Sequence, residues 1–134
     1  MANASYRKGA EKMLRGQINF ETDTIVARLV KNTYDQNLST DEFLSQVPAV
    51  AGTTDVTLTG KTVTNGVFDA NDPVFTAVPA GDVSEGVVLA KWTGSEATSP
   101  VFLYVDQIQG FPLTTNGGDV IIQFDNGQYK IFSL

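Results

Sequence analysis

From about residue 56 onward, this chain consists of short segments rich in β-branched and aromatic residues, separated by turn signals, and this pattern limits its fold more than any other feature. Two of these segments, 61–64 and 67–69, flank the dipeptide Asn65-Gly66. Asn and Gly accept the positive φ angles that a type I′ turn demands, so the dipeptide predicts a two-residue β-hairpin. β-Branched residues such as Thr and Val suit a pleated, half-buried surface.

Further strands are predicted on both sides of this hairpin. The segment 24–31 is apolar on both of its alternating faces, which is typical of a central strand. The remaining predicted strands are 74–78, 86–92, 101–107 and 119–124, with a second hairpin from Phe124 to 129–132 through Asn126-Gly127. A series of about eight short strands predicts a mainly β fold, an antiparallel β-sandwich or jelly-roll-like barrel.

A short amphipathic helix is predicted at residues 4–15. Its apolar residues Tyr6, Ala10, Met13 and Leu14 recur at the spacing of one helix face. Gly9 weakens the helix, and Gly16 is a suitable C-terminal stop.

A second short helix is predicted inside the chain. Ser39 and Glu42 have the spacing of a capping box, in which each side chain bonds a backbone N–H at the start of a helix. Phe43, Leu44 and Val47 would then form the apolar face of the helix, and Pro48 would end it.

Charge is distributed unevenly along the chain. The first 16 residues carry four basic residues and one acidic residue, a net charge of +3, whereas the rest carries five basic and fourteen acidic residues, a net charge of −9. We therefore divide the chain into a basic amphipathic arm, 1–22, and a β-sandwich domain, 23–134. The arm has two interpretations that the sequence leaves open, a cap on the protein's own sheet or an element that docks on an acidic neighbour. The candidate interface residues are Tyr6, Arg7, Lys8, Ala10, Lys12, Met13, Leu14 and Arg15.

The composition excludes several classes of function. The chain has no histidine and no cysteine, so Ser–His–Asp and Cys–His sites are impossible and a conventional zinc site is disfavoured. We predict no catalytic residue, no cofactor-binding residue and no metal ligand. We therefore predict that the protein is not an enzyme. The net charge of −6 repels phosphate backbones, which argues against a nucleic-acid partner. No apolar run approaches the ~18 residues of a membrane span, so no membrane partner is predicted.

Acidic clusters have ordinary interpretations. The segment 69–72 resembles the start of a calcium loop, but it lacks the central Gly and the distal Glu of such a loop, which favours a turn. Asp106, Asp119 and Asp125 lie at predicted strand ends and show no spacing that singles out a pair for glycoside hydrolysis.

Two further features suggest binding or crosslinking. Trp92, Tyr104 and Tyr129 could form a sugar-stacking platform, although we favour Trp92 as a residue that closes a strand and packs partly in the core. Lys61 follows Gly60 and precedes a Thr-rich strand, a position that could serve an isopeptide crosslink, but no partner for it is identifiable.

An ordered set of short segments extends over nearly the whole chain. The segments are YRKGAEKML (6–14), GQI (16–18), DTI (23–25), LV (29–30), DEFL (41–44), VP (47–48), LTGKTV (58–63), ATSP (97–100), YVD (104–106), NGGD (116–119) and FDNG (124–127). Each segment alone is common turn or strand chemistry, whereas their order is more specific. In this order the segments resemble a family of small virion proteins of tailed bacteriophages.

The resemblance implies a non-enzymatic virion structural protein, foremost a capsid decoration or cement protein. The alternatives are a tail- or collar-associated virion protein and a carbohydrate-binding module for the host receptor. The implied partners are the major capsid protein or other virion proteins, and further copies of the chain, for which a trimer at capsid three-fold positions is one arrangement. The implied location is the outer surface of the virion, after synthesis in the bacterial host cytoplasm. The family supplies no catalytic residue and no cofactor.

Overall fold

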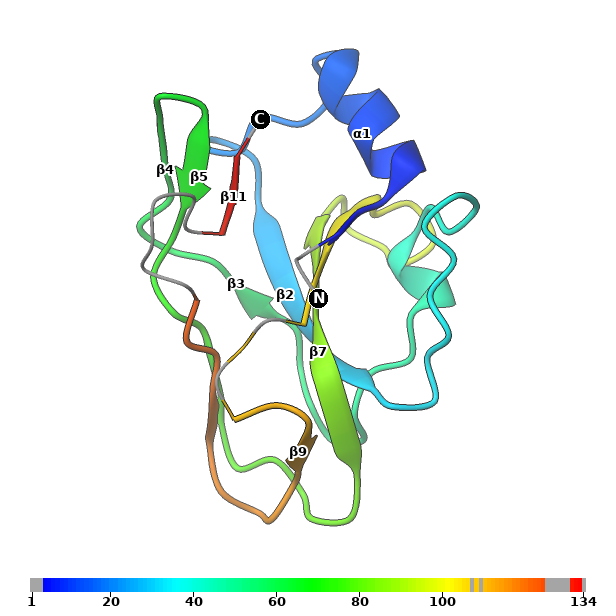
Figure 1. Cartoon of the computed structure of the whole chain (residues 1–134), viewed down its shortest axis with the longest axis vertical. Coiled ribbons are helices and arrows are strands. Elements are labelled where there is room, and N and C mark those ends of the chain that lie inside the picture. Colours follow the sequence, from blue (N-terminus) through cyan, green and yellow to red (C-terminus); the bar gives the residue numbers. More distant parts are fainter. Residues whose placement is uncertain (1–3, 107, 109, 125–130, 134) are drawn as a thin grey trace.

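A six-stranded sheet forms the centre of the protein (Figure 1). The computed structural model describes residues 4–106, 108, 110–124 and 131–133. Five strands follow the order β1-β8-β7-β2-β3, and β9 pairs with β7. Every pairing in this sheet is antiparallel. The strands are β1 (Ala4–Ser5), β2 (Ile25–Lys31), β3 (Val56–Thr57), β7 (Val83–Lys91), β8 (Val101–Val105) and β9 (Leu113–Thr114).

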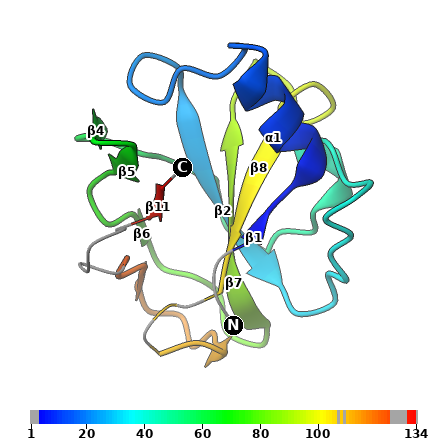
Figure 2. The same ribbon diagram turned by 45° about the horizontal axis from the view of Figure 1, so that its top comes forward.

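Two smaller antiparallel sheets cover one face of the main sheet (Figure 2). One contains β6 (Val74–Phe75) and β10 (Val120–Ile121), and the other contains β4 (Thr62–Thr64), β5 (Val67–Asp69) and β11 (Phe132–Ser133). The larger buried cluster joins Leu29 and Leu89 of the main sheet to Phe68, Phe75 and Ile122 of the covering layer. This sandwich-like, mainly antiparallel arrangement with a short N-terminal helix confirms the predicted fold class.

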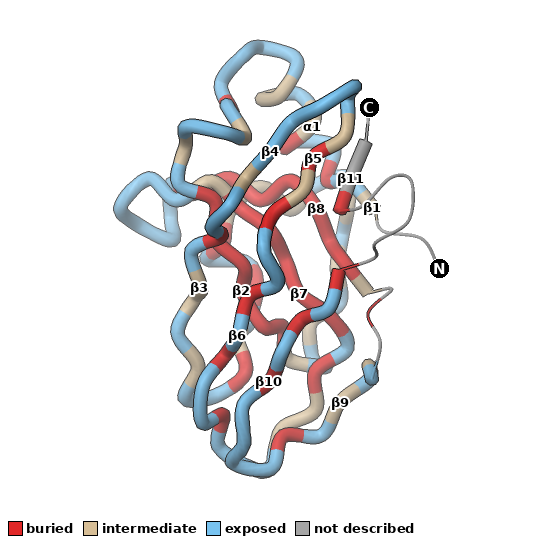
Figure 3. The backbone as a smooth tube through the Cα atoms, turned by 90° about the vertical axis from the view of Figure 1, so that its left-hand side faces the viewer, coloured by how far each residue is buried: buried red, intermediate tan, exposed pale blue. Residues whose placement is uncertain are grey.

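The opposite face of the main sheet is also buried. Val30, Val88 and Tyr104 pack there with Leu44 and Val47, which belong to the connection between β2 and β3. All residues of β2 from Ile25 to Val30 are buried, as Figure 3 shows in red. The prediction of a central strand with two apolar faces is therefore confirmed.

The β4–β5 hairpin forms where Asn65-Gly66 predicted it. Thr64 and Val67 are paired in register, and Asn65 and Gly66 have φ angles of 51° and 75°, as a type I′ turn requires. The second predicted hairpin, around Asn126-Gly127, lies outside the described residues.

Several strands differ in length from their predictions. β7 begins three residues earlier than predicted and ends at Lys91, one residue before Trp92. The strand predicted at 74–78 stops at Phe75, because Ala77 has a φ of 48° and donates its N–H to the Asp119 carboxylate. The strands predicted at 101–107 and 119–124 are shorter as well. β8 ends at Val105, and β10 spans Val120–Ile121.

The predicted internal helix is present, but it is shorter than expected and Ser39 does not cap it. Only a single 3₁₀ turn, η1 (Leu44–Gln46), is present. Side chains satisfy the preceding backbone in a different way: Asn37 Oδ1 accepts the N–H groups of Ser39 and Thr40, and Gln46 Oε1 accepts those of Glu42 and Phe43. Such local bonds compete with helix formation, and they explain why Ser39 does not cap a helix.

The N-terminal helix is shorter than predicted. α1 spans Arg7–Leu14, whereas Ala4 and Ser5 form β1 and pair with Tyr104 and Leu103 of β8. This segment thus extends the main sheet before it turns into the helix. Residues 4–14, which comprise β1, Tyr6 and α1, are therefore packed against the sandwich.

Candidate protein interface

α1 is fixed closely to β8 (Figure 2). Gly9 is buried, and a Cβ atom placed on it would lie 2.5 Å from the Phe102 Cα and 2.8 Å from the Phe102 Cβ. Only glycine allows the helix to approach the strand to this distance. Tyr6, just before the helix, is fully buried and donates its backbone N–H to the Phe102 carbonyl oxygen at 3.1 Å. The helix is therefore a rigid platform on the sheet.

The predicted apolar stripe of α1 points largely inward. Tyr6 belongs to the buried cluster on one side of the sheet, and the half-buried Met13 packs against the cluster on the other side. Ala10 is half-buried, whereas Leu14 is 87% exposed. Tyr6 and Met13 thus support the interpretation of α1 as a cap, and only Leu14 of the stripe is available to a neighbour.

The three basic residues of α1 and Arg15, which directly follows the helix, divide into two groups. Lys12 is half-buried, forms an ion pair with Glu42 at 2.7 Å and lies over the Phe43 ring, so it holds the helix against the body. Arg7, Lys8 and Arg15 are exposed.

Arg15 has a long ion pair of 3.7 Å with Glu11 of the helix. Among the described residues, Arg7 and Lys8 have no ion-pair partner. We define the outer face of α1 as Arg7, Lys8, Leu14 and Arg15. It combines free positive charge with an exposed leucine on an otherwise acidic protein.

Hydrogen bonds between two tyrosine side chains link the start of α1 to the segment that follows β2. The Tyr34 hydroxyl donates to Asp41 Oδ2 at 2.7 Å and lies 2.8 Å from the Tyr6 hydroxyl, which donates to it in turn. Burial is the main cause that raises the pKa of both tyrosines. Both phenols therefore stay neutral near pH 7, and the hydrogen bonds through Tyr34 to Asp41 fix Tyr6 in place.

Arg28 is the most buried charge among the described residues, and sequence reasoning missed its role. Its side chain on β2 is 7% exposed and binds both Asp55 carboxylate oxygens at 2.9 Å, through Nε and Nη2. Nη2 also contacts Glu96, and Nη1 donates to the carbonyl oxygens of Leu44 and Val47. Its sequence signal was a lone arginine within an apolar strand. All of these partners are backbone or side-chain groups of the protein itself. We therefore assign the Arg28 cluster a role in stabilising the fold.

The acidic candidates are not brought together as a pair. Asp119 accepts the Ala77 N–H and Asp72 accepts the Phe124 N–H, so both serve as backbone acceptors near turns. Asp106 follows β8 and has one buried carboxylate oxygen without a partner, while Asp125 lies outside the described residues. No group of three or more acidic residues that could hold a metal ion occurs within the described part of the chain.

The aromatic platform is not assembled from its predicted members. Tyr104 is buried and Tyr129 lies outside the described residues. Trp92, which directly follows β7, is 36% exposed and is not among the residues of the two core clusters. Lys61, the possible crosslinking residue, donates to the backbone carbonyl oxygen of Asp23.

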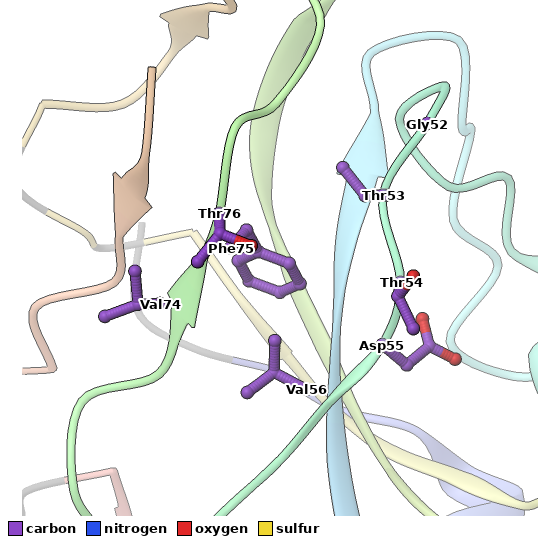
Figure 4. Close-up of a pocket in the computed structure, with 8 residues that line it drawn as sticks. All are labelled: Gly52, Thr53, Thr54, Asp55, Val56, Val74, Phe75 and Thr76. Atoms are coloured by element: carbon purple, nitrogen blue, oxygen red, sulfur yellow. The ribbon is translucent and has the colours of Figure 1, made fainter. Parts of the chain in front are cut away.

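A shallow depression of about 150 Å³ lies between the two layers of the sandwich (Figure 4). Residues 52–56 border one side and residues 74–76 of β6 border the other. Phe75 points into the space between them, and Val74 points away from it. The one charged residue of its lining is Asp55, whose carboxylate oxygens both accept hydrogen bonds from Arg28.

Comparison of the chain with protein-family models, curated proteins and solved structures found no significant match. No helix in the described residues is long and apolar enough to cross a membrane.

Proposed function

We propose that this chain is a non-enzymatic structural protein of a tailed-bacteriophage virion, a capsid decoration protein that docks through the outer face of α1. The observation that carries the proposal is the outer face itself, where Arg7, Lys8 and Arg15 surround an almost fully exposed Leu14. The phage context rests on the ordered resemblance described above. The partner is an acidic surface of the major capsid protein or of another virion protein.

The energetics of such an interface follow from its residues. Burying a leucine side chain contributes about 1.5–3 kcal/mol, whereas an exposed ion pair contributes about 0–1 kcal/mol and is screened by salt. Leu14 would therefore supply affinity, and the cations would supply orientation. Because Gly9 and Tyr6 already fix the helix on β8, binding would cost little backbone conformational entropy, and the entropic cost would come mainly from the exposed side chains.

A binding assay tests the proposal. Heads assembled without this chain are incubated with the purified protein and sedimented. We expect saturable binding of the wild type and a loss of about tenfold or more in affinity for the triple variant Arg7→Gln, Lys8→Gln, Leu14→Ser.

The matched control is Lys31→Gln with Val63→Ser, which removes one cation and one exposed aliphatic residue away from α1. This control should bind as the wild type does. Equal binding of the triple variant would place the interface elsewhere. Binding to purified tails but not to heads would favour the alternative of a tail or collar protein.

A carbohydrate-binding module remains the second candidate, and the exposure of Trp92 favours it. An indole ring with a free face can stack on a sugar. Binding of host polysaccharide that is abolished by Trp92→Ala would support this candidate over the first.

A further inference from the structure

Trp92 and Thr24 are neighbours on one face of the main sheet, at the end where β2 begins and β7 ends (Figure 1). The Trp92 N–H donates to the Thr24 carbonyl oxygen at 2.8 Å, which continues the β2–β7 ladder one pair beyond Ile25 and Lys91. Successive side chains of a strand alternate between the two faces of a sheet, and paired residues share a face. Trp92 and Thr24 therefore lie on the face opposite to that of Lys91, whose side chain forms an ion pair with Asp23 at 3.2 Å.

A second exposed threonine lies on the same face. Thr57 of β3 is paired with Val26 of β2, which is two residues along the strand from Thr24. Trp92, Thr24 and Thr57 are all exposed, and we call these three residues the Trp92 face. No described residue forms a hydrogen bond with the hydroxyl groups of Thr24 and Thr57 or with the indole N–H of Trp92. These polar groups are available to a ligand.

The loop 93–99 borders the Trp92 face. Arg28 is on the same face of β2, and its contact with Glu96 holds the loop over the sheet. Inside the loop, the buried Ser99 hydroxyl accepts the Thr93 N–H at 3.0 Å. The loop and the strands are thus fixed in place, so a ligand would have to order little of the protein backbone when it binds.

Charge limits the kind of ligand that this face can accept. The charged side chains next along these strands are already paired, Arg28 with two carboxylates and Lys91 with one. The net charge of −6 repels polyanions, so a neutral ligand is favoured. A threonine hydroxyl can both donate and accept hydrogen bonds, as sugar hydroxyls do, and an indole ring can stack on the apolar face of a sugar ring.

We infer that the Trp92 face binds an extended neutral glycan, with one sugar ring stacked on Trp92 and neighbouring sugar hydroxyls bonded to Thr24 and Thr57. The inference rests on the second candidate function, which it deepens by naming the class of glycan and two further binding residues. It does not depend on docking through α1, because none of these residues belongs to the outer face of α1.

Fluorescence of the purified protein tests the inference directly, because Trp92 is the only tryptophan of the chain. The probes are maltohexaose, cellohexaose and mannohexaose, with the anionic hexagalacturonate as a comparison. We expect at least one neutral hexasaccharide to shift the Trp92 emission in a saturable manner, and hexagalacturonate to leave it unchanged. The variant Arg7→Gln, Lys8→Gln, Leu14→Ser should bind the glycan as the wild type does, which separates this site from docking through α1.

Two variants keep the fluorescent reporter and remove one hydroxyl each. Thr24→Val and Thr57→Val should each weaken glycan binding by about three- to tenfold, the effect of one lost hydrogen bond. The matched control Thr62→Val, at an exposed position of β4, should bind as the wild type does. No emission change with any neutral hexasaccharide at millimolar concentration would overturn the inference. So would unchanged affinity in both Thr24→Val and Thr57→Val, or equal affinity for hexagalacturonate.

Discussion

Gly9 of α1 lies so close to Phe102 of β8 that an added Cβ atom would come within 2.5 Å of the Phe102 Cα. A glycine in an exposed helix usually costs about 1 kcal/mol relative to alanine. Here it contributes to stability, because the helix can reach the strand only without a side chain at this position. The position of the whole outer face of α1 depends on this contact.

Replacing Gly9 with alanine should therefore destabilise the protein, against the usual helix propensity. We expect a loss of about 1–3 kcal/mol in the free energy of unfolding, the typical cost of overpacking a filled site. Urea denaturation measures it. The control Lys8→Ala, at the exposed neighbouring position, should be neutral or slightly stabilising. A stabilised Gly9→Ala variant would show that α1 does not press on β8.

Replacing Arg28 with methionine should destabilise the protein by about 3–5 kcal/mol, because it leaves Asp55 and the carbonyl oxygens of Leu44 and Val47 without their partner. The matched control is Lys31→Met on the same strand, whose ion pair with Asp82 is 3.7 Å long and partly exposed. That variant should lose only about 0–1 kcal/mol. Equal losses in the two variants, measured by thermal and urea unfolding, would contradict the role assigned to Arg28.

Stability should fall at alkaline pH. Burial raises the pKa of Tyr6 and Tyr34 in the folded state above the ordinary value of 10.0. The unfolded chain therefore loses these protons first, and stability that is complete below pH 10 declines as the pH rises above it. The decline is at most about 1.4 kcal/mol per pH unit for each tyrosine. Urea titrations between pH 8 and pH 11 measure it.

The variant Tyr34→Phe removes one of these phenols and should make the alkaline decline shallower than in the wild type. It should also lower stability near pH 7, because Asp41 and Tyr6 lose a hydrogen-bonding partner. An alkaline decline as steep as that of the wild type would mean that other groups control it.

Replacing Trp92 with alanine should cost less than the roughly 3–5 kcal/mol typical of a fully buried aromatic residue. Trp92 is 36% exposed and is not among the residues of either core cluster. Thermal unfolding of the variant, beside Phe102→Ala as a fully buried control, measures the difference. A loss for Trp92→Ala as large as for Phe102→Ala would mean that Trp92 is a core residue after all.

The parts of the fold set by local chemistry could be predicted from the sequence. Asn65-Gly66 specified its turn because few other residues accept two consecutive positive φ angles, and β2 was visible because both of its faces are apolar. The helix expected after Ser39 is shorter because Asn37 and Gln46 offered the backbone other hydrogen bonds. Helical spacing alone could not show these competing hydrogen bonds.

The candidate interface was only partly predictable for a similar reason. Spacing grouped Leu14 with Tyr6 and Met13, but the buried side of α1 is set by Gly9 and its distant partner Phe102. Long-range contacts of this kind leave no local signal. The role of Arg28 also depends on a residue remote in sequence, namely Asp55.

We propose that this chain decorates a phage head and contacts it through the outer face of α1. Electron cryo-microscopy of virions that carry the chain tests both parts at once. We expect density for this sandwich on the outer surface of the head, with Arg7, Lys8 and Leu14 against an acidic surface of the shell. Density confined to the tail or collar, or an α1 that faces solvent on the head, would contradict it.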